Sequence, residues 1–351
     1  MTNTFNIEQP DKDLREKALK VRNASNKISQ SSDEERKNAL NCMADALVKN
    51  RDEILDANIN DFENAKGIGI SKSLLARLKL TKDKLDLGIH GIRKVCNLTD
   101  PIGQIQINKE LSNCLILQRK TVPIGVLGVI FESRPDAVMQ ISALAIRSGN
   151  GVILKGGKES NQTNIAIVKA LHEGLEESPL DKDSICLLTN RKDSIAMLHL
   201  EKDINLIIPR GSNELVKFIQ NNTRIPVLGH ADGICHLFID NYCDIDLAVK
   251  VALDSKIQYP AACNAIETLL IHKDVASRFL SKAIPIFKAN NVELRGDDKS
   301  IKYGIKIVAS HEDWETEYLD LILSIKIVDS MHDAIAHIQK YGSKHTDGII
   351  T

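Results

Sequence analysis

The feature that most constrains the fold is a regular alternation of apolar and amphipathic segments between residues 126 and 228. Residues 126–130 and 152–154 are apolar runs of strand length. Between them, Pro135 begins a segment with one apolar face at helical spacing, and Gly149 ends it. A strand, a helix and a second strand in this order predict two parallel strands joined by a right-handed crossover.

The alternation continues along the chain in the same rhythm. We predict helices over 164–175, 193–198 and 214–220, and strands over 185–188, 204–208 and 225–228. Such a series is typical of a doubly wound parallel sheet, in which ligands bind beyond the carboxyl ends of the strands.

A second α/β domain is predicted after residue 229, where the rhythm restarts. It comprises strands over 235–239 and 266–272 and helices over 246–255 and 275–289. We therefore divide the chain into residues 1–228 and 229–351.

The segments before the first buried strand are of two kinds. The first hundred residues have helical apolar spacing, with a capping box formed by Ser32 and Glu35. Residues 101–122 instead contain two short alternating runs, 104–107 and 115–118, interleaved with polar residues. They predict a β-hairpin arm outside the core.

Charge and composition exclude several classes of protein. The 351 residues include 46 basic and 47 acidic ones, and only 4% are aromatic. This balance argues against a nucleic-acid binder, which needs a basic face. The longest uncharged apolar run, 122–131, is too short to span a membrane, and the polar first residues are unlike a secretory signal. Seven cysteines at wide spacings suit a reducing compartment, so we expect a soluble cytoplasmic protein.

Two segments that follow predicted strands are candidates for binding an anionic ligand. Lys155 ends one strand. It is either a ligand-binding residue or a solvent-exposed charge in a loop. Arg210-Gly211-Ser212 stands between a strand and a helix, and is either a phosphate site at the helix start or an ordinary N-cap. The spacing of a phosphate loop and the G-x-G-x-x-G pattern are both absent, and no metal-ligand spacing is seen.

Cys263 is the cysteine that stands apart. It lies in the small-residue turn Pro260-Ala-Ala-Cys-Asn264, directly before a predicted strand. A thiol in a tight bend at a strand edge is suited to nucleophilic catalysis, because it needs only a lowered pKa and a docked electrophile. The alternative is a small buried side chain, as most free cysteines are.

Several longer motifs resemble one known family. VPIGVLGVIFESRPD at 122–136, SGNGVILKGGKE at 148–159, LIIPRGS at 206–212 and QYPAACNAIET at 258–268 are similar to γ-glutamyl phosphate reductases. Residues 328–349 fit the signature pattern of that family. The family belongs to the aldehyde dehydrogenase superfamily, so the resemblance implies a Rossmann-type cofactor domain, an α/β catalytic domain and a β-hairpin oligomerisation arm.

The resemblance implies an enzyme, an NADP-dependent phosphorylating aldehyde dehydrogenase. It would reduce L-γ-glutamyl 5-phosphate to L-glutamate 5-semialdehyde with NADPH, the second step of proline biosynthesis from glutamate. Cys263 matches the nucleophile of the family and would form a thioester. Residues 1–228 would then bind NADPH and residues 229–351 would carry the catalytic cysteine.

The resemblance also implies roles for further residues. Those matching cofactor contacts are Lys155, Gly156, Arg210, Gly211, Ser212 and Glu317. Those expected near the substrate are Ser133, Arg134, Asn264 and His345. Ser133 or Arg134 replaces the usual amide-bearing asparagine. Arg134 is either an anion clamp for the acyl phosphate or carboxylate, or a surface charge at a helix start.

Two departures from related proteins shape the expectation. Hydrolysing aldehyde dehydrogenases carry a general-base glutamate where this chain has Val227, so a thioester here would survive for exchange with phosphate or hydride instead of being hydrolysed. Family members also continue for several dozen residues beyond the signature, so we expect a C-terminally truncated chain. The alternative is therefore an inactive family member that acts as a non-catalytic partner. For an active chain we expect a homo-oligomer, and hand-off of the substrate from glutamate 5-kinase.

Overall fold

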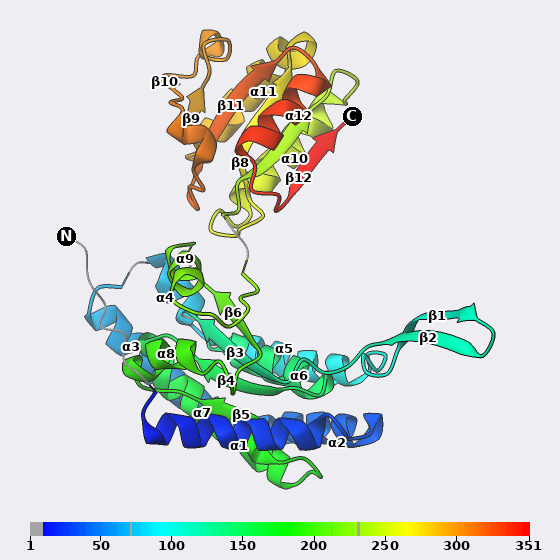
Figure 1. Ribbon diagram of the computed structural model, residues 1–351. Helices are drawn as coiled ribbons and strands as arrows, with labels where there is room; N and C mark the ends of the chain where they lie inside the picture. The colour runs from blue at the N-terminus through cyan, green and yellow to red at the C-terminus, as the bar shows by residue number, and fades with distance from the viewer. Residues whose placement is uncertain (1–9, 71, 133, 212, 230–231) are drawn as a thin grey trace. The chain divides into compact units, whose positions relative to one another are not determined.

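The chain folds into two compact units, Met1–Gly229 and His230–Thr351, here called unit 1 and unit 2 (Figure 1). The computed structural model describes residues 10–351 except 71, 133, 212 and 230–231. The division falls one residue from the boundary that the sequence predicts. No helix in the described part of the chain is long and apolar enough to cross a membrane.

Unit 1 is built on a four-stranded parallel sheet in the order β5-β4-β3-β6. The strands are β3 (Val126–Phe131), β4 (Gly151–Lys155), β5 (Ile185–Leu187) and β6 (Leu206–Arg210). The helices that connect or follow them are α6 (Asp136–Arg147), α7 (Asn161–Glu176), α8 (Arg191–Ala196) and α9 (Asn213–Asn221). The chain adds β4 and β5 on one side of β3 and then returns to its other side, which confirms the doubly wound α/β fold.

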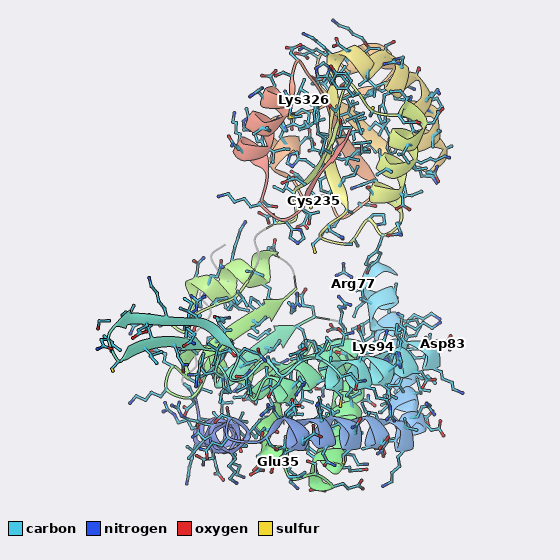
Figure 2. The ribbon with its side chains drawn as sticks, turned by 90° about the vertical axis from the view of Figure 1, so that its right-hand side faces the viewer. Glu35, Arg77, Asp83, Lys94, Cys235 and Lys326 are labelled. Atoms are coloured by element: carbon cyan, nitrogen blue, oxygen red, sulfur yellow. The ribbon has the colours of Figure 1, made fainter. Side chains whose placement is uncertain are left out.

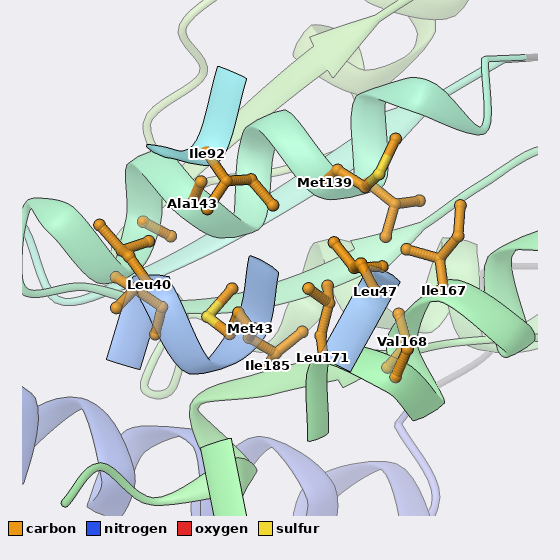
Figure 3. Packing of buried hydrophobic residues seen from close by; sticks show 14 of the residues in the cluster. Leu40, Met43, Leu47, Ile92, Met139, Ala143, Ile167, Val168, Leu171 and Ile185 are labelled. Atoms are coloured by element: carbon orange, nitrogen blue, oxygen red, sulfur yellow. The ribbon is translucent and has the colours of Figure 1, made fainter. Parts of the chain in front are cut away.

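Both faces of this sheet are buried, because the strands are apolar at every position. Leu127, Val129 and Phe131 of β3 pack into one core and Val126 and Ile130 into another. The first core is filled from α2, α5, α6 and α7, as Figure 3 shows. Continuous apolar strands of this kind are typical of parallel sheets covered on both sides.

The predicted helical region before the sheet is present as five helices. They are α1 (Lys12–Ile28), α2 (Asp33–Lys49), α3 (Arg51–Gly67), α4 (Lys72–Leu78) and α5 (Lys82–Cys96). The capping box is confirmed at the start of α2, where the side chains and amides of Ser32 and Glu35 hydrogen-bond reciprocally.

The predicted arm is also present. Strands β1 (Ile105–Ser112) and β2 (Leu115–Lys120) pair antiparallel and project from the body of unit 1 (Figure 1). Every residue of the two strands is exposed. The ribbon exposes large apolar side chains, notably Ile105, Leu115 and Ile116. An isolated two-stranded ribbon is also only marginally stable in water.

Unit 2 contains a six-stranded sheet in the order β10-β9-β11-β8-β7-β12, with every pair parallel. The strands are β7 (Cys235–Ile239), β8 (Ile266–His272), β9 (Glu293–Gly296), β10 (Ile307–Val308), β11 (Ile322–Val328) and β12 (Asp347–Ile350). The helices are α10 (Ile245–Ile257), α11 (Lys273–Ala289) and α12 (Met331–Tyr341). Helices α10 and α11 bury one face of the sheet, and α12 packs on the other.

One predicted strand of unit 1 is wrong. Residues 225–228 form only a single bridge, between Ile207 and Val227. Pro226 has no amide hydrogen to donate, so the pairing with β6 is limited to two hydrogen bonds, from Ile207 to Pro226 and from Leu228 to Ile207.

The packing of α7 on α2 yields a stability prediction. A Cβ on Gly174 would lie 2.6 Å from both the Cys42 oxygen and the Met43 Cα, so Gly174→Ala overpacks this contact. We expect it to lower the free energy of unfolding of unit 1 by about 1–3 kcal/mol, measured by denaturant titration.

Gly91→Ala is the matched control, because nothing lies within 4 Å of a Cβ at that position of α5. It should stabilise unit 1 by about 0.5–1 kcal/mol, as alanine does in an open helix position. Equal effects of the two substitutions would contradict the packing described.

Candidate active site

The candidate nucleophile lies at the amino-terminal edge of the sheet of unit 2. Cys235, the first residue of β7, is paired with Ile266, the first residue of β8. Figure 2 shows Cys235 at the end of unit 2 where β7 begins. The turn that carries Cys263 enters β8 at this same edge, so the pairing of the two strands brings both cysteines together.

Cys263 occupies a central position in a four-residue turn. The Ala265 amide donates to the Ala262 oxygen at 3.0 Å, which leaves Cys263 and Asn264 between them. The thiol-bearing residue is half-buried and Asn264 is exposed. In the described part of the chain, the amides of these two residues donate to no acceptor. Two such amides beside a thiol are suited to binding an oxyanion formed on a substrate carbonyl.

Glu317 and Cys235 lie beside this turn. A Cβ on Gly233 would lie 2.2 Å from the Cys263 oxygen and 2.5 Å from Oε1 of Glu317, so only glycine permits this approach. The Cys235 thiol donates to the Cys263 oxygen at 3.2 Å. Burial raises the pKa of Cys235 to about 11, so this thiol stays protonated as a donor.

The segment that carries Glu317 is held by the carboxylate of Asp313. Its Oδ1 accepts hydrogen bonds from Tyr318 at 2.7 Å and Arg295 at 2.6 Å, and its Oδ2 accepts from Ser310. Burial disfavours the ionised form, but these donors outweigh it and lower the pKa of Asp313 to about 2. The carboxylate is therefore ionised at neutral pH. Its hydrogen bond from Tyr318 holds the residue next to Glu317 in place.

His345 also lies in this neighbourhood. Its Nδ1 is 3.8 Å from Sγ of Cys235 and 2.8 Å from the Thr346 hydroxyl. The neighbouring strand β12 is tied to β7 by Asp347, which accepts from the His236 amide at 3.1 Å. Thus four residues singled out from the sequence, Cys263, Asn264, Glu317 and His345, lie at one end of unit 2.

Unit 1 presents a second candidate site at the carboxyl ends of its strands. Lys155 ends β4 and is only 8% exposed, and its ammonium donates to the Gly156 oxygen. Burial disfavours the charged form and lowers the pKa of Lys155. A Cβ on Gly156 would lie 2.2 Å from Nδ2 of Asn164 and 3.0 Å from the Phe131 ring. The absence of a side chain at Gly156 therefore lets the backbone at this strand end pack directly against Asn164 and Phe131.

The point where the strand order reverses lies between β3 and β6. Phe131 pairs with Arg210 there, and the Glu132 amide donates to the Arg210 oxygen at 3.1 Å. A Cβ on Gly211 would lie 2.6 Å from a carboxylate oxygen of Glu132. Open α/β sheets bind ligands at such a reversal, so Arg210 and Gly211 are placed where a cofactor is expected.

Of the other residues singled out from the sequence, one is largely exposed to solvent and two lie outside the described residues. The Arg134 side chain is 61% exposed, 3.4 Å from Asp136, and so resembles a surface charge as much as a clamp. Ser133 and Ser212 lie outside the described residues. In the described part of the chain, no three side chains of His, Cys, Asp and Glu form a group that could hold a metal ion.

Four residues near Cys263 were not recognised as site residues in the sequence. Cys235 is the first residue of a predicted strand and Gly233 lies in the connection before it, and neither position marks a site residue in the sequence. Lys256 and Glu267 form an ion pair, with Nζ and Oε2 2.6 Å apart. Glu267 stands out as the one acidic residue of a mainly apolar strand, whereas Lys256 is one of several charged residues of α10 and carries no such signal.

Comparisons with known proteins agree with the motifs. A model of the aldehyde dehydrogenase family matches residues 5–324. The γ-glutamyl phosphate reductase of Prochlorococcus marinus subsp. pastoris is 70% identical over 351 residues, which are 100% of this chain and 80% of the relative. The chain belongs to the γ-glutamyl phosphate reductase family. The resemblance inferred from the sequence is thereby confirmed.

Solved structures of the family share the fold. The γ-glutamyl phosphate reductase of Thermotoga maritima is 38% identical with a TM-score of 0.92, over 96% of this chain and 82% of that one. The Saccharomyces cerevisiae protein is 35% identical with a TM-score of 0.61, over 98% and 87%. The aldehyde dehydrogenase fold expected for this family member is thus confirmed. Enzymes of the aldehyde dehydrogenase family use nicotinamide cofactors.

The pKa of Asp313 leads to a prediction about acid unfolding. Because it is below the ordinary value of 3.8, the ionised carboxylate stabilises unit 2 above about pH 4, and this contribution is lost between about pH 4 and 2. Asp313→Asn should therefore be less stable at pH 6 and lose less stability between pH 4 and 2, measured by denaturant unfolding at each pH.

Asp298→Asn is the control, since Asp298 is an exposed carboxyl in the same unit. It should keep the acid dependence of the unaltered chain. An acid dependence of Asp313→Asn equal to that of the control would show that the Asp313 network does not stabilise unit 2.

Proposed function

We propose that the chain catalyses the NADPH-dependent reduction of L-γ-glutamyl 5-phosphate to L-glutamate 5-semialdehyde and phosphate, in proline biosynthesis. The observation that carries this proposal is the Cys263 turn, with its two available amides and with Glu317 beside it. The 70% identity to γ-glutamyl phosphate reductase of Prochlorococcus marinus supports the choice of substrate.

In this proposal Cys263 is the nucleophile. Its thiolate attacks the γ-carbonyl carbon of the acyl phosphate, and the amides of Cys263 and Asn264 stabilise the oxyanion. The attack forms the carbon–sulfur bond. Collapse of the tetrahedral oxyanion then restores the carbonyl, breaks the carbon–oxygen bond to phosphate and releases phosphate, which leaves the thioester. In the second half of the reaction, the same amides stabilise the oxyanion as the thioester is reduced, and the Cys263 thiolate leaves.

The residues at the carboxyl edge of unit 1 fit the phosphates and ribose of a dinucleotide. Lys155 provides a buried ammonium, Gly156 a strand end without a side chain, and Arg210 with Gly211 a basic strand end. Glu317 would hold the nicotinamide ribose through its carboxylate. When bound, the nicotinamide supplies the hydride. The preference for NADPH is part of the proposal, since a lysine near the cofactor favours the additional phosphate.

The presence of Val227 favours reaction of the thioester with phosphate over its hydrolysis by water. Its side chain packs with the apolar cluster of unit 1 formed around Ile207 and Ile219. An alkyl side chain cannot accept a proton from water, whereas a glutamate in that position could act as a general base. We therefore propose that the thioester persists until it is reduced or, in the reverse direction, attacked by phosphate.

Three further features of the proposal concern the surroundings of the enzyme. The exposed apolar residues of β1 and β2 would pair with another copy of the chain, making it a homo-oligomer. Arg134 would bind the phosphate or the carboxylate of the substrate, and His345 would lie near it. The enzyme would work in the cytoplasm and receive its substrate from glutamate 5-kinase.

The proposed function is tested by the reverse reaction. In the presence of glutamate 5-semialdehyde, the purified chain should reduce NADP⁺ over many turnovers only when phosphate is added, and by no more than one equivalent per chain without it. Cys263→Ser should lower the rate by at least about 10³-fold, because a neutral hydroxyl is a far poorer nucleophile. Cys243→Ser is the control, since Cys243 lies beyond the opposite end of β7 and should leave the rate unchanged.

Turnover by Cys263→Ser comparable to the unaltered chain would overturn the assignment of the nucleophile. Turnover that needs no phosphate would indicate a hydrolysing dehydrogenase. A folded chain that binds NADPH and shows no turnover would favour the alternative of a non-catalytic family member.

The cofactor site is tested by binding. Lys155→Met removes the buried ammonium and should raise the Kd for NADPH by about tenfold or more, measured by quenching or calorimetry. Lys169→Met on α7 is the control, because Lys169 is exposed and paired with Glu53. Equal affinities of the two variants would place the cofactor elsewhere.

A further inference from the structure

A fully buried ion pair joins the helix before the Cys263 turn to the strand after it. The side chains of Lys256 and Glu267 are 0% and 1% exposed, with Nζ and Oε2 2.6 Å apart. Removing two charges from water costs free energy that their attraction recovers only in part, so such a pair is a poor way to gain stability. This cost motivates the hypothesis that the pair fixes the geometry of the elements that it joins.

The two residues of the pair lie on either side of the Cys263 turn in the sequence. Lys256 lies in the last turn of α10, before Cys263, and Glu267 is the second residue of β8, after it. The ion pair thus closes the chain between positions eleven residues apart. The hydrogen bond from Ala265 to Ala262 fixes the turn itself, and the ion pair fixes the two elements from which it projects.

The other carboxylate oxygen of Glu267 reaches a second part of the site. Oε1 accepts a hydrogen bond from the Leu319 amide at 3.2 Å, and Leu319 is two residues after Glu317. Leu319 has a φ of 53°, a left-handed conformation that leucine rarely adopts and that the surrounding contacts must hold. One side chain therefore connects the Cys263 turn with the Glu317 segment.

Resting on the proposed roles of Cys263 and Glu317, we propose that Lys256 and Glu267 are positioning residues for the reaction. The ion pair fixes the position of the Cys263 turn relative to β8. The hydrogen bond from the Leu319 amide fixes the position of the Glu317 segment relative to the same strand. Neither side chain touches the substrate. Their effect is to keep the nucleophile and the ribose-binding carboxylate at a fixed separation.

An alternative is that the pair serves stability alone, and an apolar replacement distinguishes the two. A Lys256→Met/Glu267→Leu variant fills a similar volume without charges, and such replacements of buried pairs are often neutral or stabilising. It also removes the acceptor of the Leu319 amide. Single substitutions are less useful, because each would leave one buried charge without its partner.

The experiment compares this double variant with the unaltered chain in three measurements. We expect an unchanged or raised denaturation midpoint, a kcat lowered by about tenfold or more, and a KM for glutamate 5-semialdehyde within about twofold, because misplacing a reacting group affects the chemical step. Amide hydrogen exchange in residues 258–265 and 317–319 should accelerate by at least about tenfold, as expected where the contacts that hold a segment are removed.

The matched control replaces an exposed ion pair of the same unit. Asp246→Leu/Lys282→Met removes a contact of 2.7 Å between α10 and α11, far more accessible to solvent than the buried pair. It should leave kcat and the exchange of both segments unchanged. A second variant, Lys256→Met/Glu267→Gln, keeps an amide oxygen for Leu319 and remains informative if the first does not fold. It should retain slow exchange at 317–319 while losing it at 258–265.

Each outcome decides between the two accounts. Unchanged kcat and unchanged exchange in a folded Lys256→Met/Glu267→Leu variant would overturn the positioning role. If the unaltered chain itself shows no turnover, the proposed function fails, and the exchange measurement still decides whether the pair holds the two segments.

Discussion

The pairing of β7 with β8 is the constraint on which the candidate site depends. It sets Cys235 opposite Ile266, so that the Cys235 thiol meets the carbonyl of Cys263 three residues before β8 begins. Gly233 completes the arrangement, because any side chain there would collide with Cys263 and Glu317. A shift of one residue in this register would reverse the faces of β7 and separate the two cysteines.

The candidate sites of the two units lie at opposite edges of their parallel sheets. In unit 1 the candidate ligands, Lys155 and Arg210, stand at the carboxyl ends of parallel strands, where doubly wound folds bind dinucleotides. In unit 2 the Cys263 turn stands at the amino ends. The proposed reaction at Cys263 therefore needs other contacts to hold the turn in place. The buried pair of Lys256 and Glu267 provides such a contact.

Much of the fold follows from the sequence, because apolar runs and their spacing determine local structure. The bounds of β7 and β8 and the small-residue turn at Cys263 were predicted from pattern alone. Residues 225–228 looked like a strand by composition, yet Pro226 limits their pairing to one bridge. The burial of Lys256 and Glu267 could not be predicted, since a charge near a helix end or in a strand is ordinarily solvated and only the tertiary fold encloses it.

The most direct test of the account is the acylation of Cys263 in phosphate-free buffer. The purified chain is incubated with NADP⁺ and glutamate 5-semialdehyde, and the masses of its cysteine-containing peptides are determined. The account predicts one γ-glutamyl group per chain, on the Cys263 peptide, which is discharged when phosphate is added. NADPH formation without an acyl group on Cys263, or acylation of another cysteine, would contradict it.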